Sequence, residues 1–176
     1  MTKRRITLVG LVAFLVFGLL MGGQIIYKKF WLDASMLQKS QEIPGVLSAK
    51  IVEVNGQQEL DVETGKIIDL PATSMMLEKL AGKMPIRYLD QRNDELEQIL
   101  KQMQFSLQES IVRGNFTEME RNVKVIADNA GVQINLNMDN NNIYLVLNKG
   151  EAQLVAVLER NGQARFLTSN KNLEGG

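Results

Sequence analysis

Four carboxylates stand close together in the middle of the chain and are the residues best suited to chemistry: Asp90, Asp94, Glu95 and Glu97. Paired carboxylates can act as general acid and base when their environments push their pKa values apart, and they can also bind metals. The same residues flank the predicted start of the longest helix, where acidic side chains face the positive end of the helix dipole. We therefore interpret the cluster as a helix start and predict no catalytic or metal-binding residue in it.

Three other polar motifs also have structural interpretations. Residues 139–142, Asp-Asn-Asn-Asn, are similar to the start of a calcium loop but lack its central glycine and terminal glutamate, so a hairpin turn explains them. Asn115-Phe116-Thr117 is formally a glycosylation sequon, while Thr117 is also a good helix N-cap. Ser74 and Lys79 do not have the S-x-x-K spacing of a Ser–Lys dyad.

The composition excludes several classes of function. The chain contains no cysteine and no histidine, which rules out disulfides, thiolate chemistry, Cys/His zinc sites and histidine as a general base. All twenty acidic residues but only fifteen of the twenty basic residues lie from Asp33 onward, so this part carries a net charge of −5. It has no cluster of Lys and Arg that would neutralise phosphates. We expect no nucleic-acid partner, no cofactor and no enzymatic activity.

One uncharged segment near the N-terminus has the length of a membrane span. Residues 6–26 read ITLVGLVAFLVFGLLMGGQII, and about 20 apolar residues in a helix cover the roughly 30 Å hydrocarbon core of a bilayer. A cleaved signal peptide is the alternative, but the apolar run continues past Gly22-Gly23 and no A-x-A-like cleavage site follows. We therefore predict a single transmembrane helix over residues 6–26, after a short N-terminus of residues 1–5.

The residues beside this helix predict its orientation. Three basic residues precede it and two follow it, so the positive-inside rule places residues 1–5 in the cytoplasm and the C-terminal domain outside the cytoplasmic membrane. Gly18 and Gly22 form a GxxxG pair, which can bring two membrane helices together, although glycine is also common in such helices. The aromatic and cationic residues expected at the bilayer interface are Tyr27, Lys28, Lys29 and Trp31.

The rest of the chain predicts a compact α+β domain over residues 44–168. A juxtamembrane helix is expected over residues 27–43, just before a Pro-Gly pair. The domain divides into two possible sub-units, residues 34–90 and 93–168, with no proline- or serine-rich linker between them. The polar residues 169–176 are expected to form a flexible tail.

In the first sub-unit the sequence predicts the order helix, strand, strand, helix, strand. Asn55-Gly56 lies between the alternating segments 48–54 and 58–63 and predicts a hairpin with a type I′ turn. Thr73 or Ser74 is expected to cap the short helix that follows. Residues 86–89 are expected to form a brief strand.

In the second sub-unit the sequence predicts two helices and an antiparallel β meander. The longest helix is expected to begin at Asn93 or Asp94, and the next at Thr117, where Glu120 completes a capping box and Phe116 acts as a hydrophobic staple. The four expected strands of the meander are residues 132–138, 142–148, 152–159 and 164–168.

The nine methionines could line an adaptable groove for a partner or fill a core. Met103, Met119 and Met138 fall on predicted core faces, which favours packing. Met75 and Met76 are adjacent in a predicted helix, so both cannot share one face. We expect one of these two to be exposed.

The order of elements over residues 34–90, with Ile43-Pro44-Gly45-Val46-Leu47-Ser48-Ala49-Lys50 at the first helix-to-strand junction, resembles a ring-building module. Such modules occur in membrane-anchored secretion, flagellar and sporulation assemblies. The resemblance implies a small αββαβ unit that stacks side by side with its neighbours.

These observations lead to three hypotheses of function. The favoured one is a bitopic membrane protein without enzymatic activity, whose external domain contacts a protein partner or further copies of itself as a scaffold or assembly factor. The alternative is a membrane-anchored sensor or regulator that binds a small ligand or a cell-wall component. The third is an enzyme that uses carboxylates alone, with Asp90 and Asp94 as its best candidates.

Overall fold

The computed structural model describes Phe17 and residues 34–160, and it confirms a compact α+β domain. The chain divides into two compact units, residues 1–38 and 39–176. Within the described part, no helix is long and apolar enough to cross a membrane. Several predicted features lie outside the described residues: the anchor except for Phe17, the strand 164–168, the tail 169–176, and Gly18, Gly22, Tyr27, Lys28, Lys29 and Trp31.

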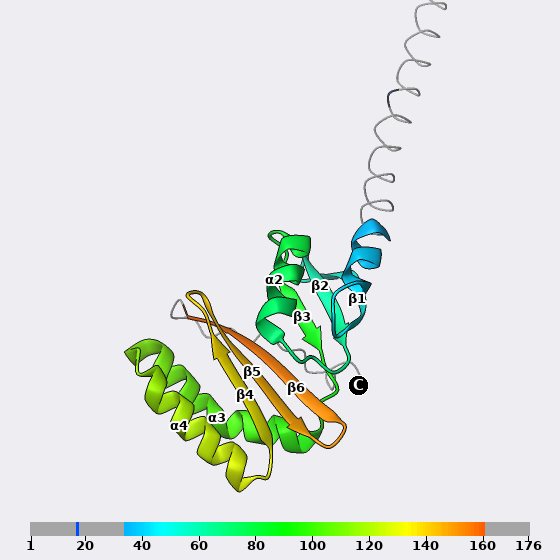
Figure 1. The fold of residues 1–176 in the computed structure, drawn as a ribbon. Helices are drawn as coiled ribbons and strands as arrows, with labels where there is room; N and C mark the ends of the chain where they lie inside the picture. Colours follow the sequence, from blue (N-terminus) through cyan, green and yellow to red (C-terminus); the bar gives the residue numbers. More distant parts are fainter. Residues whose placement is uncertain (1–16, 18–33, 161–176) are drawn as a thin grey trace, which may run out of the picture. The chain divides into compact units, whose positions relative to one another are not determined.

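Residues 34–41 are helical, and two three-stranded sheets follow (Figure 1). The first half of the domain contains β1 (Val46–Val54), β2 (Gln57–Thr64), α2 (Leu70–Ala81) and β3 (Ile86–Leu89). The second half contains α3 (Asp94–Arg113), α4 (Phe116–Asn129), β4 (Gln133–Met138), β5 (Asn142–Lys149) and β6 (Ala152–Glu159). The predicted order of the elements is therefore confirmed over the described residues.

The first sheet has the order β1-β2-β3, with β1 antiparallel and β3 parallel to the central β2. The predicted hairpin joins β1 to β2 through Asn55 and Gly56, whose φ angles of +52° and +77° are those of a type I′ turn. Leu60 and Val62 of β2 are fully buried, as is Leu77 of α2. Side chains of α2 and of β2 thus both contribute to the core beside the first sheet.

The start of α2 differs from the prediction. The N-cap is Asp69, whose carboxylate accepts a hydrogen bond from the backbone N–H of Ala72 at 3.0 Å. Thr73 and Ser74, the predicted caps, lie inside the helix and are buried. The helix begins earlier because Pro71 is compatible with the first helical turn, where its missing N–H costs no hydrogen bond.

Gly45 is a position where a side chain would be strongly disfavoured. Its φ is +85°, and a Cβ atom there would lie 2.9 Å from Cγ1 of Ile67, which is itself buried. We expect Gly45→Ala to lower the free energy of unfolding by about 2–3 kcal/mol, from backbone strain plus overpacking. Urea denaturation of the full chain in a non-ionic detergent measures this change.

Gly56 is the matched control for that substitution. Its φ is +77°, but no atom lies within 4 Å of the Cβ that alanine would add. Gly56→Ala should therefore cost only the backbone strain, about 1 kcal/mol. Equal losses for Gly45→Ala and Gly56→Ala would show that contact with Ile67 contributes nothing.

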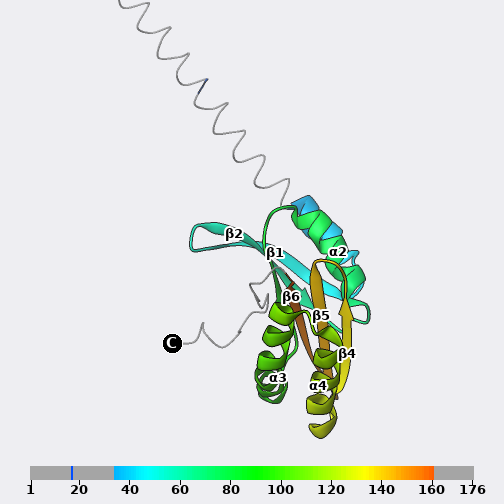
Figure 2. The ribbon, with the colours of Figure 1, turned by 90° about the vertical axis from the view of Figure 1, so that its left-hand side faces the viewer.

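The second sheet has the order β4-β5-β6, is antiparallel throughout, and carries α3 and α4 on one face (Figure 2). The side chains of Ile143, Leu145 and Leu147 enter the core shared with these helices. The alternate residues Tyr144 and Val146 point to the opposite face and are also buried, on the side where β5 contacts α2. Burial on both faces explains why β5 is apolar at every interior position.

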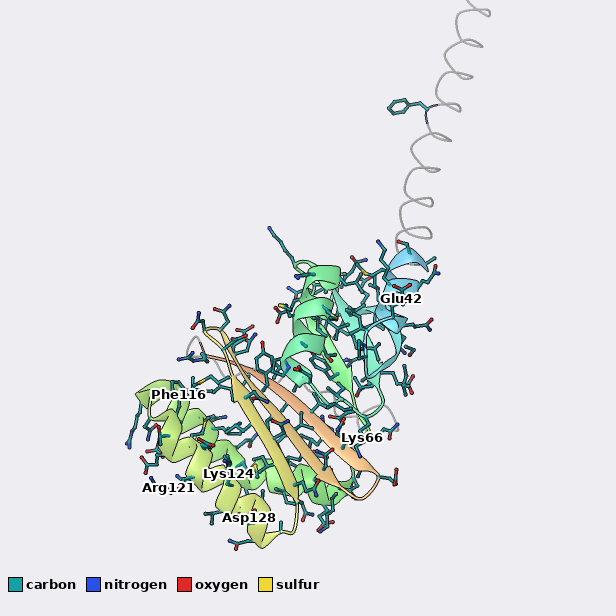
Figure 3. The ribbon with its side chains drawn as sticks, viewed as in Figure 1. Glu42, Lys66, Phe116, Arg121, Lys124 and Asp128 are labelled. Atoms are coloured by element: carbon teal, nitrogen blue, oxygen red, sulfur yellow. The ribbon has the colours of Figure 1, made fainter. Side chains whose placement is uncertain are left out.

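The helix α3 begins where the sequence predicts, but α4 does not. Asn93 caps α3 by accepting a hydrogen bond from the N–H of Leu96 at 2.9 Å. α4 starts at Phe116, so Thr117 is an interior helical residue and the predicted capping box with Glu120 is wrong. Phe116, labelled in Figure 3, packs against the core at the start of this helix. The centre of its ring lies 4.6 Å from the guanidinium carbon of Arg160.

The methionines follow the predicted pattern only in part. Met103 and Met119 are buried in the core, as expected. Met138 is 48 % exposed, because it is the last residue of the edge strand β4 and has few neighbours there. Met75 and Met76 are both exposed, at 51 % and 43 %, where one exposed residue was expected. The outer side of α2 is therefore more apolar than predicted.

Candidate functional site

The carboxylates around Asp90 serve the fold in different ways. The side chain of Asp90 is buried: its oxygens accept two hydrogen bonds of 2.6 Å from Arg92, and Oδ2 also accepts the backbone N–H of Val155 at 2.7 Å. Asp94, Glu95 and Glu97 occupy the first turn of α3, which confirms their interpretation as helix-start residues. Among the described residues, no group of three or more acidic side chains is arranged to hold a metal ion.

The turn between β4 and β5 is stabilised by its own aspartate. Asp139 Oδ1 accepts the backbone N–H groups of Asn141 and Asn142, each at 2.7 Å, and Oδ2 accepts the hydroxyl of Tyr144 at 2.8 Å. This confirms the predicted hairpin turn. Partial burial favours the neutral acid, but the hydrogen bonds from Asn142, Tyr144 and Asn141 outweigh it and lower the pKa of Asp139.

This lowered pKa predicts an acid-dependent loss of stability. The ionised Asp139 stabilises the fold above the pKa of an aspartate in the unfolded chain, about 4, and the contribution is lost as the pH falls through the lower folded value. We expect Asp139→Asn to flatten the decline of the unfolding free energy below about pH 4. Urea denaturation between pH 2 and pH 6 measures this. Asp128→Asn, on the exposed side of α4, should leave the decline unchanged.

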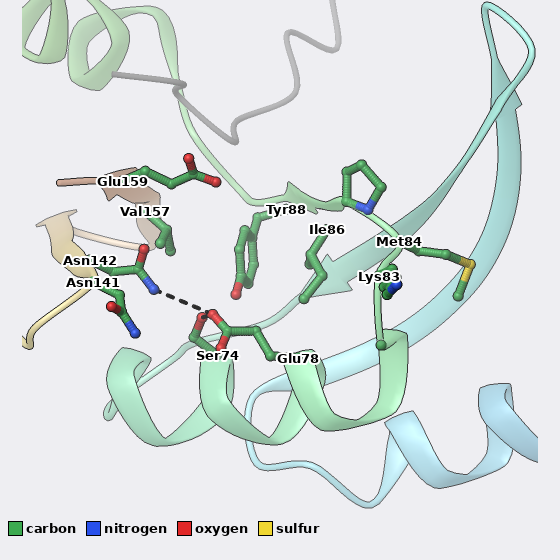
Figure 4. Close-up of a pocket in the computed structure, with 12 residues that line it drawn as sticks. Ser74, Glu78, Lys83, Met84, Ile86, Tyr88, Asn141, Asn142, Val157 and Glu159 are labelled. Carbon is green, nitrogen blue, oxygen red and sulfur yellow. Dashed lines mark hydrogen bonds between the residues drawn. The ribbon is translucent and has the colours of Figure 1, made fainter. Parts of the chain in front are cut away.

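A cleft of about 460 Å³ lies between α2, β3 and the strands β5 and β6 (Figure 4). Ser74 and Glu78 line it from one side of α2, and Tyr88 lines it from β3. Asn142 and Glu159 line it from β5 and β6. The exposed Lys83 lies at the end formed by the loop between α2 and β3. Polar groups from four parts of the fold thus meet in this one hollow.

The hydroxyl of Tyr88 is the least satisfied polar group of the cleft. Tyr88 is 1 % exposed, and its hydroxyl forms no hydrogen bond of good geometry among the described residues, although Ser74 lies close enough to lower its pKa. Figure 4 shows the hydroxyl directed toward Ser74 and Glu78. Burial raises the pKa of Tyr88 well above its usual value, so the group keeps its proton at neutral pH. A buried hydroxyl without a partner is costly and is expected to meet a polar atom of water or of a ligand.

The carboxylate of Glu78, which lines the cleft, forms only long hydrogen bonds with the described residues. It accepts from Ser74 Oγ and from Asn142 Nδ2, both at 3.4 Å, which is at the outer limit for hydrogen bonds. Asn142 also donates to Tyr144, so a polar chain runs from α2 to the β4–β5 turn. Burial raises the pKa of Tyr144 to about 12, and the charges of Asp139 and Glu78 add to this effect.

Comparisons of the chain with protein-family models, with curated proteins and with solved structures find no match. Function must therefore be inferred from the site itself and from the sequence.

The sequence did not single out the cleft. The sequence indicates Ser74 as a helix cap or as a possible partner of Lys79, whereas its hydroxyl lies beside Glu78, four residues along α2. Tyr88, Asn142 and Glu159 are far apart in the sequence, and no spacing rule joins them. The one available signal was Tyr88 itself, because a tyrosine on the inner face of a strand needs a partner for its hydroxyl.

Proposed function

We propose that this chain is a single-pass membrane protein without enzymatic activity, whose α+β domain acts through protein–protein contacts as a scaffold or assembly factor. Residues 6–26 form its membrane helix, with the N-terminus in the cytoplasm and the domain outside the cytoplasmic membrane. The apolar sequence of that segment and the basic residues before it support this placement.

The observation that carries the proposal is the outer face of α2. Met75 and Met76 of α2 are both exposed, and Ile68, which precedes the N-cap Asp69, is 84 % exposed. The opposite face of the same helix is already buried in the core of the first sheet. Glu78 and Lys79 of the same helix are also exposed, so the two methionines lie next to charged side chains. Adjacent exposed methionines with charged neighbours are typical of an adaptable contact surface with a polar rim, so we infer that a protein surface covers Met75 and Met76.

The chemistry of the domain supports a role without catalysis. Its chain lacks histidine and cysteine, and Asp90, the leading carboxylate candidate, is occupied by Arg92 and Val155. A carboxylate held in this way is engaged in the fold and is not directed toward a substrate.

Photo-crosslinking in intact cells tests the proposal. A photoreactive residue at position 76 should give a discrete adduct with an identifiable protein or a second copy, while one at position 112 on the exposed side of α3 should not. Met75→Glu with Met76→Glu should abolish the adduct, and Val112→Glu should leave it. A chain that stays a monodisperse monomer in detergent and gives no adduct at position 76 contradicts the proposal. Protease accessibility of the domain in the same cells tests its orientation.

The cleft favours a second candidate function, a membrane-anchored sensor or regulator that binds a small ligand. Its polar lining supports this candidate, as does the buried hydroxyl of Tyr88, which forms no hydrogen bond of good geometry among the described residues. A screen of small ligands by thermal shift, in which none raises the melting temperature of the full chain, would count against it.

A further inference from the structure

The cleft is lined by more hydrogen-bond acceptors than donors. Glu78 and Glu159 are both exposed carboxylates that line it, and neither forms an ion pair with another described residue. Ionised carboxylates can only accept hydrogen bonds. Among the described lining residues Lys83 is the one basic residue, against the two carboxylates, so this part of the lining carries a net negative charge. A complementary ligand must bring donors and positive charge.

The buried hydroxyl of Tyr88 gives independent support for a ligand. It is directed toward Ser74 and Glu78 (Figure 4), and among the described residues it forms no hydrogen bond of good geometry, with Ser74 as its near neighbour. A tyrosine hydroxyl can accept a hydrogen bond as well as donate one. A group with several donors could therefore reach both Tyr88 and the carboxylate of Glu78.

We propose that this cleft binds an ammonium or guanidinium group, with Glu78 and Glu159 as its charged partners and the Tyr88 hydroxyl as a further acceptor. An ammonium group carries three N–H donors and a guanidinium group carries five, which matches an acceptor-rich lining. A metal ion is a poorer match, because the described residues contain no cluster of three acidic ligands. The group can come from a lysine or arginine side chain of a protein partner or from a free amine.

This proposal stands apart from docking on the outer face of α2. Ser74, Glu78 and Gly82 follow one another at four-residue steps along the cleft side of the helix. Met75 and Met76 lie on its exposed outer side. A change on one side can therefore leave the other intact, and the two proposals can fail separately.

The test is an NMR titration of the isotope-labelled full chain in a non-ionic detergent. The cationic probes are cadaverine and the peptide acetyl-Gly-Ala-Arg-Ala-Gly-amide, and the neutral control is the same peptide with norleucine in place of arginine. We expect saturable shifts of the amide signals of Asn142, Val157 and Glu159 with the cationic probes and none with the control. Tighter binding of the peptide identifies a protein side chain as the source, and tighter binding of cadaverine identifies a free amine.

Charge-neutral variants complete the test. Glu78→Gln and Glu159→Gln should each weaken cation binding about 10-fold, the loss expected for one charge-assisted hydrogen bond. Tyr88→Phe should weaken it by a smaller factor. Glu151→Gln removes the same charge at the exposed β5–β6 turn and should change nothing. Equal binding of the norleucine peptide, no saturable shift, or an equal loss with Glu151→Gln would overturn the proposal.

Discussion

Replacing Asp90 by alanine is expected to lower the free energy of unfolding by about 3–5 kcal/mol, the typical cost of removing one partner of a buried ion pair. The Asp90 side chain is 1 % exposed and that of Arg92 is 12 % exposed, so the guanidinium would remain buried without its counterion. The backbone N–H of Val155 would also lose its acceptor. Because Val155 belongs to β6, the substitution also weakens the contact between the first sub-unit and β6.

Urea denaturation of the full chain in a non-ionic detergent measures this effect. The control is Asp94→Ala, in the exposed first turn of α3, which should cost less than about 1 kcal/mol because it removes only a favourable interaction with the helix dipole. A loss for Asp90→Ala as small as that for Asp94→Ala would mean that Arg92 finds solvent or another partner when Asp90 is removed.

Replacing Gln153 by alanine is expected to cost about 3 kcal/mol, because it leaves two buried backbone groups unpaired. The side chain of Gln153 accepts the N–H of Ile67 at 2.7 Å and donates to the carbonyl of Ile67 at 3.0 Å. It also donates to Asn148 Oδ1 at 2.8 Å. One amide side chain thus pairs the loop before α2 with the second sheet, as a neighbouring strand would.

Two measurements check this prediction. Urea denaturation gives the change in unfolding free energy, and hydrogen exchange should show faster exchange of the Ile67 amide in Gln153→Ala. Gln133→Ala on β4 removes an exposed glutamine and should change the stability by less than about 0.5 kcal/mol. Unchanged protection of the Ile67 amide in Gln153→Ala would contradict the role of Gln153 as its partner.

The sequence predicted those parts of the fold that depend on local signals. Asn55-Gly56 specified the first hairpin, because few other residue pairs accept two positive φ angles in succession. The apolar residues at three- and four-residue spacing predicted α3, and Asn93 was correctly predicted at its start. The unbroken apolar run of β5 indicated burial on both faces, although it did not reveal what covers each face.

The failed predictions concern choices between neighbouring residues and contacts over long distances. Asp69, and not Thr73, caps α2, where Pro71 is compatible with the first turn, and Asn115 precedes α4 without forming a side-chain cap hydrogen bond. The candidate site was beyond prediction for a different reason. Its residues come from α2, β3, β5 and β6, and only the packing of the two sub-units brings them together.

The double-sided burial of β5 has a consequence for the way the protein is made. Ile67 leaves the ribosome 86 residues before its partner Gln153, which takes roughly 4–17 seconds at a synthesis rate of about 5–20 residues per second. During that interval the side of the first sub-unit that later meets Tyr144 and Val146 has no cover. We therefore expect the first sub-unit to complete its fold only after β5 and β6 have been synthesised. A nascent chain that ends before β5 is expected to bind chaperones.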